Sequence, residues 1–166
     1  YERSPIHLLE SLSKEEINDL LNDKEFTEKI NKVEQSFNDY IQKVEEKEGD
    51  MIAYLSMEFG LHDTLKIFSG GLGMLAGDYL KQASDSNKNM IGIGLLYRNG
   101  YFTQQITKEG YQISAQYPQK FSHLPLQAEK DENGVWRKIT IAFPGRNIYA
   151  KIWRCDVGRI PLYLLD

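Results

Sequence analysis

The stretch that decides the fold of this chain reads SGGLGMLAGD and spans residues 69–78. Its glycines, Gly70, Gly71 and Gly73, stand directly before an apolar run that is compatible with a helix. Glycine has no Cβ, so the backbone there can adopt positive φ and let a ligand approach closely. If the helix begins near Leu72, the free N–H groups of the loop and the positive end of the helix face one point, which favours an anion such as phosphate. A tight turn that only brings a helix close to a strand is the alternative interpretation.

An almost continuously apolar run, from Met51 to Met57, precedes this loop. Such a run predicts a strand that is buried on both faces, as in a parallel sheet. It is followed by the polar residues Glu58, His62 and Asp63. In open α/β sheets, polar groups beyond the carboxyl ends of the strands line the ligand crevice. We therefore expect Glu58 beside the glycine loop, with His62 as the histidine nearest the cleft; a capping or salt-bridged carboxylate is the alternative for Glu58.

The region 51–96 is predicted to form a parallel strand–helix–strand unit. The helix is expected to run to about Ser84, and a second apolar strand follows over residues 90–96. The helix should face the sheet through its apolar residues, which are Leu72, Leu75, Ala76, Tyr79, Leu80 and Ala83. Gly92 and Gly94 in the second strand are interpreted as points of close packing against that helix.

Residues 97–166 are predicted to be rich in β-strands, because β-branched and aromatic residues alternate there with turn signals. The candidate strands span residues 101–106, 136–143, 148–154 and 160–165. The second and third of these should form a hairpin around the turn at Gly145. Polar and aromatic side chains follow the carboxyl end of the strand at 90–96, where they either line a sugar site or pack the loop: Tyr97, Arg98, Asn99 and Tyr101.

The N-terminal segment, residues 5–48, is charged and predicted to be helical. Ser13 and Glu16 match a capping box at the start of one helix. Apolar residues at helical spacing form one stripe further on, at Phe26, Ile30, Val33, Phe37, Ile41 and Val44. We expect this stripe to dock on the body of the protein; a partner, such as a second copy in a homo-oligomer, is the alternative.

Composition and charge exclude several classes of function. The 166 residues carry a net charge of −4, which does not favour binding to nucleic acid. No apolar run is long enough to span a membrane and no signal peptide is visible, so a cytoplasmic location is expected. The single cysteine, Cys155, lies in a strand-like run and is interpreted as structural. His7, His62 and His123 are far apart in the sequence and do not predict a metal site.

Three ordered motifs resemble those of the α-glucan phosphorylases that act on glycogen, starch and maltodextrin. They read YLSMEFGL at 54–61, SGGLG at 69–73 and GIGLLYRNGYF at 92–102. The likeness extends from about Pro5 to Asp166, and is nearest to the prokaryotic branch, which has the sequence Glu-Phe-Gly-Leu-His after its first strand.

The resemblance implies an α/β fold, the N-terminal part of a retaining glycosyltransferase with two Rossmann-like domains (GT-B type). Phosphate would attack the non-reducing end of an α-1,4-glucan and release glucose 1-phosphate, with pyridoxal phosphate on a lysine of a C-terminal domain that is absent from this chain. The strand-end glutamate of the family, given a catalytic role, corresponds to Glu58. The phosphate- and substrate-binding positions correspond to Gly70, Gly71, Leu72 and Gly73, with His62 added as a neighbour.

The sequence also departs from the family pattern. Animal phosphorylases have a tyrosine near the cofactor where this chain has Gly60, and an asparagine and an arginine flanking the glycines where it has Ser69 and Met74. A nucleotide-sugar glucan synthase of the same architecture would carry lysine-threonine before the glycines and aspartate after them. Phe68, Ser69 and Met74 disfavour that alternative. A non-catalytic glucan-binding module remains open.

Length fits one domain, whereas the family needs several hundred residues in two domains. The chain begins at Tyr1 and stops at Asp166 directly after a strand-like run, so we expect it to be a fragment. We divide it into a helical extension, residues 1–50, and a partial N-terminal Rossmann-like domain, residues 51–166. Without the cofactor domain, the fragment should be inactive.

Overall fold

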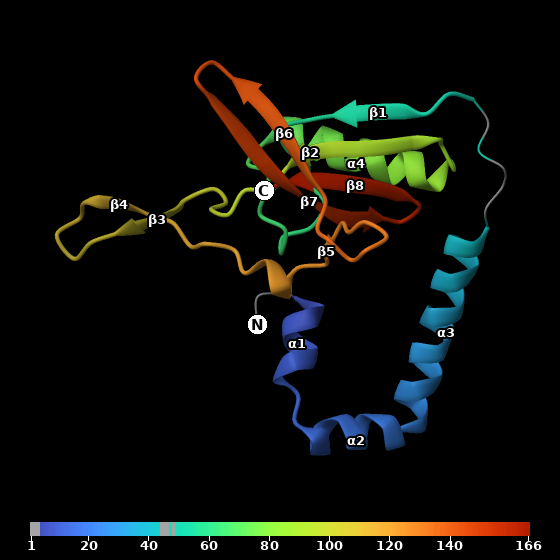
Figure 1. The fold of residues 1–166 in the computed structure, drawn as a ribbon. Helices are drawn as coiled ribbons and strands as arrows, with labels where there is room; N and C mark the ends of the chain where they lie inside the picture. Colours follow the sequence, from blue (N-terminus) through green and yellow to red (C-terminus); the bar gives the residue numbers. More distant parts are fainter. Residues whose placement is uncertain (1–3, 44–46, 48) are drawn as a thin grey trace.

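The structure, a computed structural model, describes residues 4–43, 47 and 49–166. It is a mixed α/β protein in which one mixed sheet forms the body and a chain of helices forms an arm beside it (Figure 1). None of the helices in the described ranges is both long and apolar enough to cross a membrane.

A parallel strand–helix–strand unit begins the body, as predicted. Strand β1 (Ile52–Leu55) leads through the glycine loop into helix α4 (Gly71–Asp85), and strand β2 (Met90–Leu95) follows. The two strands are parallel neighbours, with Ile52 opposite Met90 and Leu55 opposite Ile93. The glycine loop therefore lies between the carboxyl end of β1 and the amino end of α4.

The remaining strands extend this sheet in the order β1-β2-β8-β7-β5, with β6 paired to β7. Strand β8 (Ile160–Leu165) is parallel to β2 and antiparallel to β7 (Arg146–Val157), which makes the sheet mixed. Strand β6 (Lys138–Phe143) forms the predicted hairpin with β7, and β5 (Gln127–Ala128) closes the far edge. The turn at Gly145 has a φ of +78°, which glycine tolerates without strain.

The core lies on one face of the sheet, where α4 packs. Leu162 and Leu164 of β8 are fully buried, as are Leu80 of α4 and Phe59. A Cβ at Gly92 would stand 2.8 Å from Leu162 and 3.0 Å from Leu80, so this glycine permits close packing as predicted. Burying large apolar side chains of this kind contributes about 1.5–3 kcal/mol each.

Two predictions about burial are wrong. β1 is not buried on both faces: it is the edge strand of the sheet, and Ile52 and Leu55 are 51% and 69% exposed. The predicted apolar face of α4 is confirmed for Ala76, Leu80 and Ala83 and wrong for the other three residues: Leu72, Leu75 and Tyr79 are exposed. The buried side of α4 consists instead of small residues and one leucine: Gly73, Ala76, Gly77, Leu80, Ala83 and Ser84.

The arm consists of helices α1 (Pro5–Ser11), α2 (Lys14–Asn22) and α3 (Lys24–Gln42), which run away from the body and back (Figure 1). The predicted capping box is confirmed: Ser13 N–H donates to Glu16 at 2.8 Å, and Glu16 N–H donates to the Ser13 hydroxyl at 3.2 Å. These hydrogen bonds hold the pKa of the Glu16 carboxyl below its ordinary value. The helical region is thus three short helices with defined starts.

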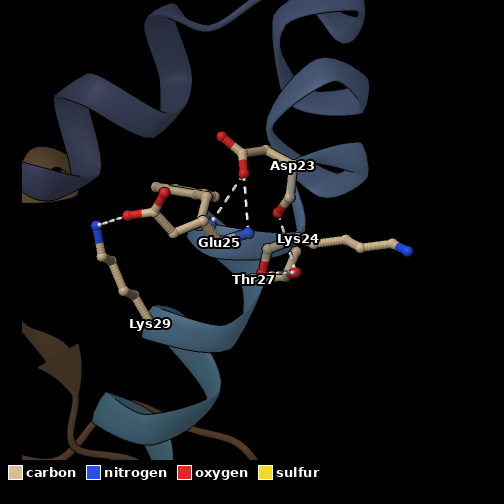
Figure 2. Close-up of polar contacts among 6 residues, drawn as sticks. Asp23, Lys24, Glu25, Thr27 and Lys29 are labelled. Atoms are coloured by element: carbon tan, nitrogen blue, oxygen red, sulfur yellow. Dashed lines mark hydrogen bonds and ion pairs between the residues drawn. The ribbon is translucent and has the colours of Figure 1, made fainter.

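Asp23 makes the corner between α2 and α3. Its carboxylate accepts from the N–H groups of Glu25 and Phe26 at 2.9 and 3.1 Å, and Lys29 pairs with Glu25 at 2.7 Å (Figure 2). Such a side-chain cap satisfies N–H groups that have no partner within the helix. The sequence signal for a new helix here was therefore local and strong.

The apolar stripe of α3 does not dock on the described body. Ile30, Val33 and Phe37 are 46%, 69% and 60% exposed, and no residue of α3 is buried. Phe26 and Ile41 are partly covered, while Val44 lies outside the described residues.

Polar contacts fix the end of α3 to the body instead. The Tyr40 hydroxyl lies 2.6 Å from the Ser84 hydroxyl and donates to Asp85 at 2.8 Å. Arg159, in the turn between β7 and β8, donates to the Tyr40 carbonyl and to the Ser84 carbonyl, and its guanidinium stacks on the Tyr40 ring.

Between β2 and β5 the chain leaves the sheet. Strands β3 (Thr103–Ile106) and β4 (Gln112–Ala115) form a separate antiparallel hairpin that projects from the body (Figure 1). The short 3-10 helix η1 (Phe121–His123) then brings the chain back to the start of α1, above that helix in the view of Figure 1. β4 and β5 were not predicted from the sequence.

Candidate functional site: a hollow beside the glycine loop

The glycine loop has a simpler backbone than predicted. Gly70 caps α4 in an extended conformation, with a φ of −167°, and Gly71 is the first helical residue. Gly70, Gly71 and Gly73 all lie outside the positive-φ region. The expectation that these glycines supply positive φ is therefore wrong, and their role is spatial.

That spatial role differs along the loop. A Cβ at Gly70 or Gly71 would meet nothing within 4 Å, so the first turn of α4 opens onto free space. A Cβ at Gly73 would stand 2.5 Å from the Cβ of Phe68 and 3.2 Å from a carboxylate oxygen of Glu58. Gly73 thus lets Glu58 approach the helix, while Gly70 and Gly71 leave room for a ligand in front of it.

Glu58 lies where the sequence places it, beside the loop and partly buried. Its carboxylate oxygens lie 3.4 Å from the Ser69 amide and 3.3 Å from the Ser69 hydroxyl, both of which donate. The Ser56 hydroxyl donates to the Glu58 carbonyl at 2.9 Å and shapes the turn after β1. Glu58 therefore ties the end of β1 to the start of the glycine loop.

A hollow of about 270 Å³ adjoins this contact. It brings together side chains from three segments: Glu58 after β1, Lys66 and Ser69 before α4, and Tyr97, Asn99 and Tyr101 after β2. The structure thus places three of the four residues that follow β2 in the candidate site. Arg98 lies elsewhere, with its guanidinium 4.6 Å from the Phe121 ring centre and 3.6 Å from the Asp166 carboxylate.

Lys66 is the residue of this hollow that sequence reasoning missed. Its backbone is fixed by Gln119, which accepts from Lys66 N–H at 2.8 Å and donates to the Lys66 carbonyl at 3.2 Å. A Cβ at Gly100 would stand 2.7 Å from the Lys66 Cβ, so that glycine also allows the close approach. No local motif marks Lys66, because both contacts come from distant parts of the chain.

His62 is exposed and does not line this hollow. Its Nδ1 lies 2.9 Å from the Thr64 hydroxyl and accepts from Thr64 N–H at 3.2 Å. Its carbonyl also accepts from Leu65 N–H at 3.0 Å. The imidazole therefore shapes the turn that leads to Lys66.

The arrangement combines a carboxylate, an ammonium group, a hydroxyl, an amide and two aromatic rings beside the open end of a helix. Backbone N–H groups at a helix N-terminus and a nearby ammonium attract phosphate. Aromatic rings and amide groups together suit a sugar, which has apolar faces and hydroxyl groups. The hollow can thus receive both an anion and a carbohydrate.

Comparison with known proteins is consistent with this chemistry. A family model described as "Protein of unknown function (DUF3417)" matches residues 1–65, which include the arm and β1. The rest of the chain, with the glycine loop and the hollow, is covered by the curated relatives.

Within the aligned regions, about a third of the residues are identical between this chain and these relatives. A maltodextrin phosphorylase of Thermococcus litoralis is 36% identical over 99% of this chain and 21% of its own length. Glycogen phosphorylases of Mycobacterium tuberculosis and Aquifex aeolicus are 36% and 34% identical over 98% of this chain, and 20% and 24% of their own lengths. The chain spans between a fifth and a quarter of these relatives. Over 98–99% of its length, this chain is similar in sequence to glycogen and maltodextrin phosphorylases of prokaryotes.

Proposed function

We propose that this chain is the N-terminal part of an α-1,4-glucan phosphorylase, which uses phosphate to release glucose 1-phosphate from the non-reducing end of a glucan. Homology to glycogen and maltodextrin phosphorylases over 98–99% of the chain is the observation that carries the proposal. The hollow beside the glycine loop supports it, because its groups suit a phosphate and a sugar together.

In this proposal the glycine loop and Lys66 attract the phosphate. The space in front of Gly70 and Gly71 lets an oxyanion reach the N–H groups of the first turn of α4. The Lys66 ammonium adds a charge from the side of the hollow. Positioned donors of this kind stabilise the negative charge that moves during the reaction.

Glu58 is proposed as a positioning residue. A free carboxylate would repel phosphate, but that of Glu58 accepts from Ser69 and so orders the loop. Tyr97, Asn99 and Tyr101 are proposed to contact the glucosyl unit. His62 is proposed to act indirectly, through the turn that precedes Lys66.

Pyridoxal phosphate is proposed as the cofactor of the complete protein, held by a lysine outside this chain. It would add its phosphate group to the cleft opposite the glycine loop. The open space before Gly70 and Gly71 fits a phosphate group on that side. We further propose a cytoplasmic location; the homo-oligomer considered above stays a prediction.

The decisive variant is Gly71→Val in the complete protein, assayed for glucose 1-phosphate release from maltodextrin and phosphate. A branched side chain would fill the space in front of the loop, and we expect a loss of roughly 100-fold or more in rate. Leu75→Val, at an exposed position of the same helix, controls for the introduction of a β-branched residue into α4 and should retain activity. Wild-type rates in Gly71→Val would refute the role of the loop.

The alternatives are separated by substrate. A nucleotide-sugar glucan synthase would transfer glucose from the nucleotide sugar and would not react with phosphate. A glucan-binding module would catalyse neither the transfer nor the release of glucose 1-phosphate. The isolated 166-residue chain, supplied with maltodextrin, phosphate and pyridoxal phosphate, should give no turnover above background. The isolated chain would supply only one side of the proposed cleft, so each of its hydrogen bonds to phosphate would compete with water.

A further inference from the structure

A second cavity, of about 290 Å³, lies between the arm and the body. Ser4 and His7 contribute from the start of α1, Thr64 and Lys66 from the segment before the glycine loop, and residues 117–120 with His123 and Leu124 from the segment around η1. It shares the Lys66 side chain with the hollow described above, but its other lining residues are different.

The cavity is lined by basic groups. His7, Lys66, Lys120 and His123 lie on its wall, and none of the described residues that line it carries a carboxylate. This is a local departure from a chain whose net charge is −4. Within the described part of the chain, neither lysine ammonium has a carboxylate in ion-pair distance. The acidic group at its edge is Glu10, which lies 3.6 Å from His123 Nε2.

The floor of the cavity is rigid. Gln119 is buried there, and its side chain bonds the Lys66 backbone on both sides and donates to the Tyr97 carbonyl at 2.7 Å. Its own N–H donates to the Arg98 carbonyl at 2.7 Å. Lys66 and Lys120 are therefore carried by backbone that is held in place before any ligand arrives.

Two imidazole rings form the wall of the cavity on the side of the arm. His7 of α1 and His123 of η1 are stacked, with their centres 5.8 Å apart and their planes 11° from parallel. The Ser4 hydroxyl donates to the His123 carbonyl at 3.4 Å. The Tyr117 hydroxyl accepts from Gln105 at 2.8 Å, which leaves its own O–H free to donate.

We propose that this cavity binds a small molecule that carries a phosphate group. Two lysines without an ion-pair partner among the described residues, two histidines and a tyrosine line a space at the small end of the range for ligand sites. Charge-assisted hydrogen bonds to phosphate are about twice as strong as neutral ones. Bound there, the ligand bridges α1 and the body and adds to the contacts that hold the arm.

Calorimetric titration of the complete protein tests the proposal with three probes: inorganic phosphate, glycerol 2-phosphate and glycerol. The titrations are made in the Gly71→Val background, so that phosphate in front of the glycine loop adds little to the signal. We expect both phosphate-bearing probes to give a binding signal and glycerol to give none. Tighter binding of glycerol 2-phosphate identifies an organic monophosphate as the ligand, and equal or weaker binding identifies free phosphate.

Lys120→Gln and His7→Gln locate the site, because neither residue lies in the hollow proposed for catalysis. Each should weaken phosphate binding about tenfold, while Lys108→Gln, at the β3–β4 turn, should leave it unchanged. Thermal unfolding shows that each variant is folded. Equal affinity in the Gly71→Val protein with and without Lys120→Gln or His7→Gln would overturn the proposal, as would a failure of both phosphate probes to bind. Binding that depends on Lys120 supports it even if the protein proves not to be a phosphorylase.

Discussion

Helices α3 and α4 are both amphipathic, yet they meet the rest of the protein in opposite ways. α4 buries six residues, most of them small, whereas α3 buries none. Several large apolar residues of both helices are exposed, among them Phe37 on α3 and Leu75 on α4, although Leu80 of α4 is fully buried. An apolar stripe therefore identified each helix, but it did not identify the side on which the helix packs.

Backbone proximity explains the difference. Gly60 N–H donates to the Gly73 carbonyl at 2.7 Å, and a Cβ at Gly77 would overlap the Gly60 carbonyl. Glycines thus let the segment after β1 lie directly on α4, and the larger side chains point elsewhere. α3 has no such contact and is held at its end by Tyr40 and Arg159.

A large effect on stability is expected when a side chain fills this contact. Gly77→Ala should destabilise the protein by about 3 kcal/mol in urea unfolding, because the new methyl group meets backbone that cannot move aside. Gly71→Ala is the matched control in the same helix: it meets open space and gains helix propensity, so its stability should stay within about 1 kcal/mol of wild type. Equal stability of the two variants would show that the close contact is absent.

A second effect on stability, of similar size, separates the body from the arm. Leu164→Ala removes a fully buried side chain and should cost about 2–5 kcal/mol. Phe37→Ala removes a side chain that is 60% exposed and should cost under about 1 kcal/mol in the same urea experiment. A cost for Phe37→Ala as large as for Leu164→Ala would mean that another surface covers the stripe of α3.

The smallest expected effect concerns the chemical reactivity of the Cys155 thiol. Burial raises the pKa of the Cys155 thiol from its ordinary value near 9 to about 11, because the thiolate is poorly solvated in the sheet. Since the thiolate is the reactive form, a thiol reagent should label unfolded but not native protein at pH 8. The same shift favours the folded state below pH 9, and this contribution is lost as the pH rises from 9 to 11.

An added cysteine extends this experiment to the comparison of the two regions. Val33→Cys, on the exposed stripe of α3, should react at once under native conditions, while Cys155 stays protected. Rapid native labelling of Cys155 would place it outside the core, and slow labelling at position 33 would mean that the stripe is covered.

Much of the candidate site could be predicted, because its parts lie close together in the sequence. Glu58 and the glycine loop are connected by one short segment, and Tyr97, Asn99 and Tyr101 follow a recognisable strand. The two groups of residues lie close together because β1 and β2 pair in parallel, so that their carboxyl ends are at the same edge of the sheet. The two apolar runs predicted this parallel pairing. Lys66 could not be found in this way, since Gln119 and Gly100 hold it from later parts of the chain.

The sequence by itself determined the features that depend on neighbouring residues. The caps at Ser13 and Asp23, the turn at Gly145 and the order strand–helix–strand all follow from local hydrogen bonding, backbone freedom and the period of apolar residues. The three motifs also led to a resemblance that agrees with the names of the relatives, which are glycogen and maltodextrin phosphorylases.

Only the tertiary structure decided what depends on distant partners. It placed β8 beside β2, left β1 at an edge, and chose the side of small residues as the buried side of α4. It also brought His7 against His123, which lie far apart in the sequence. This contact helps to form a basic cavity that no sequence motif predicted. The burial of a side chain and the charge around it depend on both surfaces of a tertiary contact. A single segment of the sequence contains only one of these two surfaces.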